Sequence, residues 1–82
     1  MTSLRDYPEK YKRFLERLRQ ARLEAGLTQT EVANVLQKPQ SFVSKCETGE
    51  RRVDVVELQV LANLYGVPLT YFVEGIAKEQ HE

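Results

Sequence analysis

The sequence predicts an all-α fold, a compact bundle of five helices. Apolar residues recur at spacings of three and four along most of the chain, which is typical of amphipathic helices. Glycine and proline divide the chain into segments of helical length, and no segment alternates apolar and polar residues as a strand would. The 82 residues suffice for one small domain, which we expect to span 1–82 with a core at about 8–75 and a frayed tail at 76–82.

The first helix is predicted to begin at Pro8, because the missing N–H of a proline is no loss in a first helical turn. Gly26 is predicted to end this helix as a left-handed C-cap. The apolar face of the helix comprises Tyr11, Phe14, Leu15, Leu18, Ala21 and Ala25.

Two further helices are predicted to follow in close succession. Thr28 and Glu31 have the T-x-x-E spacing of a capping box, which predicts a second helix to about Leu36. Pro39 disfavours helical geometry in the residue before it, so a third helix is predicted at about 40–48, ending before Gly49. Because only about three residues connect them, the two helices must turn sharply, and this is the helix-turn-helix arrangement. Their predicted buried residues are Val32, Ala33, Leu36, Val43 and Cys46.

Asp54 can cap a fourth helix that ends before Gly66, and Pro68 can open a short fifth helix. The apolar positions of the fourth helix are Val56, Leu58, Leu61, Ala62, Leu64 and Tyr65. Those of the fifth are Leu69, Phe72 and Val73.

The composition is that of an ordinary soluble chain, with 41% hydrophobic and 29% charged residues. No apolar run approaches the roughly 20 residues that cross a bilayer, so no membrane association is expected. Cys46 is the single cysteine, which excludes an internal disulfide and favours a cytoplasmic location. The net charge is zero, but residues 1–52 contain eleven Lys/Arg against seven Asp/Glu (+4), whereas 53–82 contain one against five (−4). This asymmetry permits a basic face and a polyanionic partner.

Three segments in register carry a resemblance to a known family: RQARLEAGLTQTEVA, SFVSKCETGERR and LANLYGVPLTYF. Over Leu18 to Gly75 the sequence resembles the phage repressors and Cro proteins of the XRE helix-turn-helix family. The resemblance implies a lambda-repressor-like fold and a sequence-specific, double-stranded DNA-binding regulator of transcription. Gln37 departs from the pattern, since the family usually places glycine in this turn. Either Gln37 adopts a positive φ, at a cost of about 1 kcal/mol, or Pro39 reshapes the turn.

The resemblance also implies roles for individual residues. The third helix is expected to enter the major groove, where Gln can pair with adenine and Lys with guanine. The residues expected to contact bases are Lys38, Gln40, Ser41, Ser44 and Lys45, and those expected to contact phosphates are Gln29, Thr48, Arg51 and Arg52. The alternatives are that Gln40 and Ser41 only satisfy the helix start, that Gln29 is an ordinary exposed residue, and that the two arginines are solvated charge. Arg22 and Glu47 are expected to form a partly buried, mainly structural ion pair.

Other residues leave two interpretations open. Phe42 lies either at the rim of the DNA surface or in the core, whereas Cys46 is expected to be a core residue. A homodimer on a palindromic operator is expected, because one recognition helix makes few contacts. Possible dimer contacts are Tyr71, Phe72 and Val73, although Phe72 can instead complete the core. His81 has no neighbouring ligands, so no metal site is expected.

The alternative function is a protein-interaction module, such as an antitoxin subunit or an adaptor, which the zero net charge and the acidic C-terminal third favour. The polar face of the third helix argues against this alternative, because protein interfaces concentrate aromatic and apolar anchors. The sequence contains no Ser/His/Asp set, paired ligand motif or glycine-rich phosphate loop. We therefore expect neither catalysis nor a cofactor, and no small-molecule ligand is evident.

Overall fold

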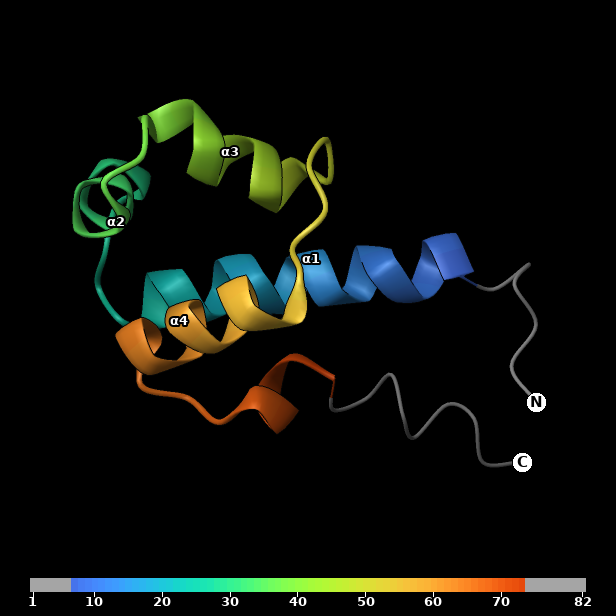
Figure 1. The fold of residues 1–82 in the computed structure, drawn as a ribbon. Helices are drawn as coiled ribbons and strands as arrows, with labels where there is room; N and C mark the ends of the chain where they lie inside the picture. Colours follow the sequence, from blue (N-terminus) through green and yellow to red (C-terminus); the bar gives the residue numbers. More distant parts are fainter. Residues whose placement is uncertain (1–6, 74–82) are drawn as a thin grey trace.

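The computed structural model describes residues 7–73, and all regular structure in this range is helical (Figure 1). The elements are the α-helices α1 (Tyr7–Glu24), α2 (Gln29–Leu36), α3 (Gln40–Thr48) and α4 (Val55–Tyr65), followed by the 3₁₀ helix η2 (Leu69–Phe72). The predicted all-α class is confirmed, with the difference that the fifth segment is a four-residue 3₁₀ helix. The predicted tail at 76–82, including His81, lies outside the described residues. None of the described helices is both long and apolar enough to cross a membrane.

Local sequence signals set the ends of the helices. The Thr28 hydroxyl accepts a hydrogen bond from the Glu31 N–H (3.1 Å), and the Glu31 carboxylate accepts one from the Thr28 N–H (2.9 Å), which confirms the predicted capping box. Asp54 caps α4 as predicted, and Glu57 completes a second box there by accepting from the Asp54 N–H (3.0 Å). Gly26, Gly49 and Gly66 follow α1, α3 and α4 with positive φ.

The turn between α2 and α3 keeps a left-handed residue even though that residue is glutamine. Gln37 has φ 58° and ψ 45°, and it is the one non-glycine residue among 7–73 with a positive φ. The next N–H, of Lys38, donates to the Ala33 carbonyl (2.9 Å) and so satisfies the end of α2. Gln37 therefore adopts the strained conformation, and Pro39 begins α3 from an extended geometry (φ −67°, ψ 155°) without reshaping the turn.

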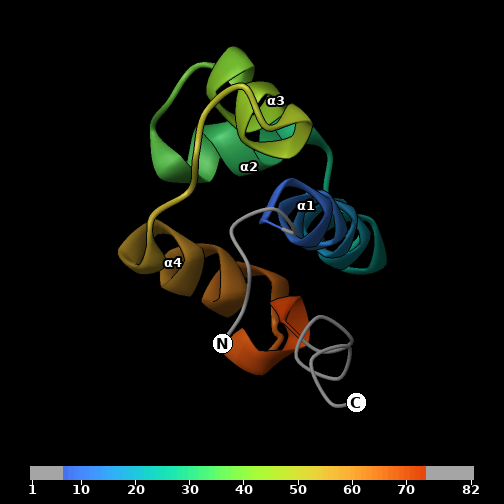
Figure 2. The same ribbon diagram turned by 90° about the vertical axis from the view of Figure 1, so that its right-hand side faces the viewer.

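The helix α1 runs along the molecule, with α2 and α3 on one side and α4 and η2 on the other (Figures 1 and 2). The core lies where these elements meet and consists of Phe14, Leu18, Ala21, Val32, Ala33, Val43, Cys46, Leu61, Ala62, Tyr65 and Phe72. Phe72 is fully buried and packs edge-to-face against Phe14, with ring centroids 6.2 Å apart. The short η2 helix thus anchors the end of the described chain to α1.

Two residues predicted on the apolar faces of the first and fourth helices lie on the surface. Val56 in α4 is 70% exposed. It precedes the buried Leu61 by five residues, which places it roughly 140° away around the helix and off the buried face. Ala25 is also exposed, directly after the last residue of α1, Glu24. Leu36, predicted as buried, is half-buried at the end of α2.

Candidate nucleic-acid interface

The helix α3 presents polar side chains from its first two turns. Gln40, Ser41 and Lys45 are exposed, as is Lys38 in the preceding turn, and Ser44 is half-buried. Val43 and Cys46 point into the core on the opposite side and hold the helix in place. Four of the five residues predicted to contact bases are therefore open to solvent.

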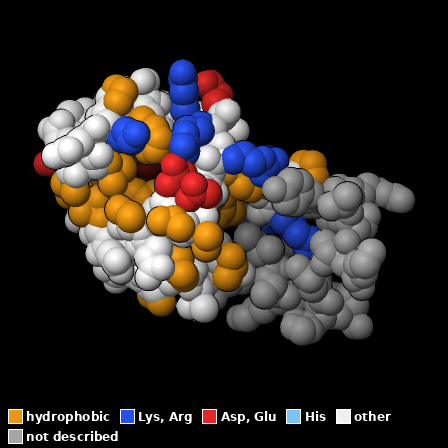
Figure 3. Space-filling model, in the orientation of Figure 1, with side chains coloured by type: hydrophobic (Ala, Val, Ile, Leu, Met, Phe, Trp, Pro, Cys, Tyr) orange, Lys and Arg blue, Asp and Glu red, His pale blue; other side chains and the backbone are white. Residues whose placement is uncertain are grey.

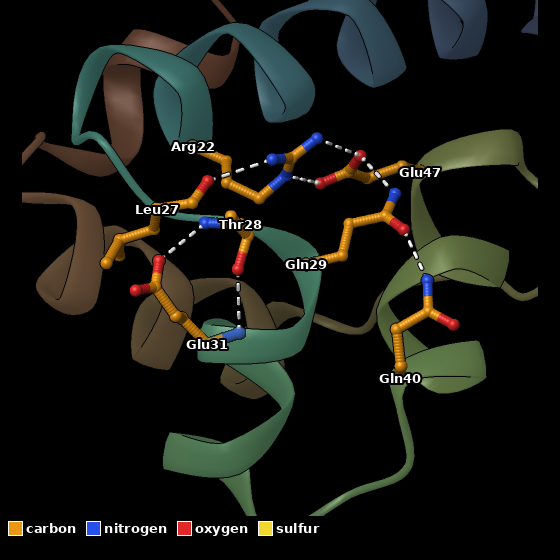
Figure 4. Close-up of polar contacts among 7 residues, drawn as sticks. All are labelled: Arg22, Leu27, Thr28, Gln29, Glu31, Gln40 and Glu47. Carbon is orange, nitrogen blue, oxygen red and sulfur yellow. Dashed lines mark hydrogen bonds and ion pairs between the residues drawn. The ribbon is translucent and has the colours of Figure 1, made fainter.

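A chain of hydrogen bonds connects the start of α3 to the end of α1 (Figure 4). The Arg22 guanidinium donates to both Glu47 carboxylate oxygens, at 2.6 Å from Nε and 3.1 Å from Nη2. Glu47 Oε1 also accepts from Gln29 Nε2 (3.0 Å), and Gln29 Oε1 accepts from Gln40 Nε2 (2.6 Å). Sequence reasoning missed the link between Gln29 and Gln40, because the two side chains belong to different helices and meet only in the folded chain.

This chain of hydrogen bonds fixes the orientation of two amide groups. A carboxylate can only accept hydrogen bonds, so the Gln29 side chain must point its NH₂ group, and not its oxygen, toward Glu47. The Gln29 oxygen therefore points toward Gln40, where it can only accept, so Gln40 must donate to it from its NH₂ group. Gln40 is left with its carbonyl oxygen and a second N–H for an external group. That pair can accept from N6 and donate to N7 of an adenine in the major groove.

The ion pair between Arg22 and Glu47, expected from the resemblance, is present and buried. The side chain of Arg22 is 8% exposed and that of Glu47 is 4% exposed. The hydrogen bond from Glu47 raises the pKa of the Arg22 guanidinium above its ordinary value, so the pair stays charged. Arg22 also donates to the Leu27 carbonyl (2.9 Å), which ties the pair to the loop before α2. The pairing compensates a negative charge on the helix that would otherwise repel a polyanion.

The residues predicted to contact phosphate have different environments. Gln29 is half-buried and engaged in the amide chain, whereas Thr48 is exposed and donates to the Lys45 carbonyl (3.3 Å). Arg52 is exposed, with its guanidinium 4.3 Å from the centre of the Tyr11 ring. The structure thus places these residues around α3, but it does not draw them into one cluster.

Arg51 has a partner that the sequence analysis did not assign. Its guanidinium donates to both oxygens of Glu57, at 2.9 and 2.7 Å, and the pKa of Glu57 is lowered chiefly by these bonds. The same guanidinium lies 4.6 Å from the centre of the Phe42 ring. Phe42 is half-buried and packs against the core, and the Lys38 ammonium also lies near its ring, at 5.3 Å from the centre. The D-x-x-E spacing from Asp54 could have predicted that the Glu57 carboxylate is held at the start of α4 by a capping box.

The candidate dimer contacts are not equally accessible. Phe72 has no exposed surface, so it completes the core, as the second interpretation of this residue expected, and offers no surface to a second subunit. Tyr71 is half-buried beneath Arg17, whose Nε donates to the Tyr71 carbonyl (2.9 Å). Val73 is 45% exposed, and nearby Leu69 is 36% exposed.

Comparison with known proteins identifies the fold. A family model described as a helix-turn-helix domain matches residues 13–70, which is 58 of the 82 residues and extends from α1 into η2. This match agrees with the XRE-type resemblance of the sequence and supports DNA binding. No curated protein and no solved structure matches the chain significantly. With most of its length matched, and with α2 and α3 joined by a three-residue turn, the chain belongs to the helix-turn-helix domain family.

Proposed function

We propose that this protein is a sequence-specific, double-stranded DNA-binding transcriptional regulator that reads its operator with α3. In this proposal Lys38, Gln40, Ser41, Ser44 and Lys45 contact bases. Gln29, Thr48 and Arg52 contact phosphates, and Arg51 joins them only if it exchanges Glu57 for a phosphate oxygen.

The observation that carries the proposal is the exposed start of α3 held by the Gln40–Gln29–Glu47 chain. A side chain that discriminates bases must be both accessible and oriented, because each good bidentate pair is worth about 1–3 kcal/mol only when its donor and acceptor are aligned. Gln40 is exposed, yet its amide is fixed by Gln29 at 2.6 Å. An ordinary helix-start residue has no need of such a connection to a buried ion pair.

A homodimer completes the proposal. Two copies related by a two-fold axis place their recognition helices about 34 Å apart, one turn of DNA, on a palindromic site. The surface offered for this contact includes Leu69 and Val73, together with the exposed part of Tyr71. Sedimentation at micromolar concentration tests the association, and a chain that stays monomeric even on operator DNA contradicts it.

Selection from random duplex DNA tests the function. Enrichment of one palindromic sequence, with an affinity that falls steeply as salt rises, supports the proposal, because bound phosphates release counterions. If no sequence is enriched, the protein-interaction module becomes the better explanation.

A matched pair of variants tests base reading by Gln40. Gln40→Ala is expected to relax preference at one base position by about 1–3 kcal/mol. Gln59→Ala, at an exposed position of α4, serves as the control and is expected to leave the preference unchanged. An equal loss of affinity on every sequence contradicts base contact by Gln40.

A further inference from the structure

An apolar pocket with a volume of about 250 Å³ opens between α3 and α4. Its apolar lining consists of Leu36, Phe42, Cys46, Val53, Val60 and Leu61, which come from α2, α3, α4 and the loop between the last two. Figure 2 shows α2 and α3 on one side of the molecule and α4 on the other, with α1 beside both. Figure 3 shows hydrophobic side chains gathered on the face of the molecule below the basic ones.

The pocket is large enough for a ligand. An apolar cavity of about 150 Å³ suffices to bind benzene, so this pocket has room for a substituted ring or a short alkyl chain. On the α4 side the lining includes Val60, which is 45% exposed. Burial of each methylene of a ligand strengthens binding about fourfold, which favours an occupant with a compact apolar body.

The charges at the mouth indicate the polar end of that ligand. Two charged residues, Lys38 and Glu57, complete the lining. Glu57 is already compensated by Arg51 through two hydrogen bonds. The Lys38 ammonium lies 5.3 Å from the centre of the Phe42 ring, and no carboxylate among residues 7–73 forms an ion pair with it. Glu57 also attracts Lys38 electrostatically, but the two cations Lys38 and Arg51 face this one carboxylate, so the mouth carries a net positive charge beside an apolar pocket.

We propose that this pocket binds a small amphipathic carboxylate, with its apolar part between α3 and α4 and its carboxylate on Lys38. Phe42 and Cys46 line the pocket from the inner side of α3, so an occupant contacts the helix whose outer side is offered to DNA. A carboxylate on Lys38 also removes a positive charge from that outer surface. Bound ligand consequently weakens DNA binding, and this consequence, unlike the binding itself, rests on the proposed function.

Three probes with the same alkyl chain test the pocket in the absence of DNA. Octanoate, octanol and octylamine are titrated separately into the full chain while backbone amide resonances are recorded. Octanoate is expected to shift the resonances of the pocket residues, octanol to do so more weakly, and octylamine most weakly. Equal affinity for octylamine and octanoate, or shifts spread evenly over the molecule, overturns the proposal.

Two variants on α4 locate the ligand. Val60→Phe fills the mouth and is expected to abolish octanoate binding, whereas Val55→Phe makes the same change at a 69% exposed position outside the lining and is expected to preserve it. Circular dichroism verifies that both variants are folded. Loss of binding in neither variant, or in both folded variants equally, overturns the assignment to this pocket.

Lys38→Gln tests the polar contact. An exposed ion pair contributes a few tenths of a kcal/mol to 1 kcal/mol, so octanoate binding is expected to weaken about twofold to fivefold while octanol binding stays the same. Unchanged octanoate affinity refutes the role of Lys38.

Operator affinity measured with and without saturating octanoate then tests the coupling. An affinity that does not fall refutes the coupling while the pocket stands. A chain that binds no DNA refutes the proposed function, and the titration of the protein alone still decides the pocket.

Discussion

Replacement of both members of the Arg22–Glu47 pair is expected to destabilise the fold less than replacement of either one. In Glu47→Leu the guanidinium, 8% exposed, keeps only its bond to the Leu27 carbonyl. In Arg22→Met the carboxylate, 4% exposed, keeps only its bond from Gln29. Each single variant therefore leaves a nearly unpaired buried charge, and the free energy of unfolding is expected to fall by about 3–5 kcal/mol.

The double variant Arg22→Met/Glu47→Leu leaves no buried charge. What remains without a partner is the Leu27 carbonyl and the inward N–H of Gln29, at about 1 kcal/mol each, so the expected loss is about 2 kcal/mol. If the effects of the two single replacements were additive, the free energy of unfolding would fall by about 6–10 kcal/mol, which is comparable with the whole stability of a small domain. Urea denaturation followed by circular dichroism separates these results.

An exposed pair on α1 supplies the control for this experiment. Gln20 donates to the Glu24 carboxylate (2.7 Å) at the surface, and Glu24→Leu is expected to change stability by less than about 0.5 kcal/mol. The reasoning is refuted if the double variant is as unstable as the sum of the two single variants. It is equally refuted if Glu47→Leu costs no more than the surface control.

Three further outcomes are expected. Gln37→Gly relieves a left-handed glutamine and is expected to raise the free energy of unfolding, measured by urea denaturation, by up to about 1 kcal/mol; a lower free energy of unfolding contradicts the strain. Gly49→Ala is expected to destabilise more than Gly26→Ala in the same assay, because a Cβ at Gly49 would lie 2.9 Å from Leu15 whereas Gly26 has open space; equal losses contradict this packing argument. Burial raises the pKa of Tyr65 from 10.0 to about 12, so the unfolded chain loses this proton first and stability is expected to fall between pH 10 and 12. Tyr65→Phe is expected to remove this decrease of stability with pH, and an unchanged decrease assigns it to other titrating groups.

The helix boundaries could be predicted from the sequence because their signals are local. Thr28 and Glu31 lie three residues apart and bond each other's backbone, and Gly49 supplies a left-handed residue where α3 ends. Such signals act within one turn, so they need no knowledge of the neighbouring helices. The position of α3 followed from them, whereas the expectation that its leading residues are presented outward came from the family resemblance.

The remaining features depend on how the helices pack, which the sequence pattern does not specify. Val56 has the same hydrophobicity as a core residue, and only the rotation of α4 against α1 leaves it exposed. The contact of Gln40 with Gln29 joins residues eleven apart on two helices, at an angle set by the turn at Gln37. The partner of Arg51 was likewise missed, because a loop arginine can reach several carboxylates.

The buried thiol of Cys46 makes the chain its own reporter of internal motion. The residue is 3% exposed, and burial raises its pKa, so little of the reactive thiolate reaches solvent at neutral pH. A thiol reagent too large for the pocket between α3 and α4 can modify it only when α3 lifts away from its neighbours. The rate of labelling by such a reagent therefore measures how often α3 detaches, with no engineered cysteine required.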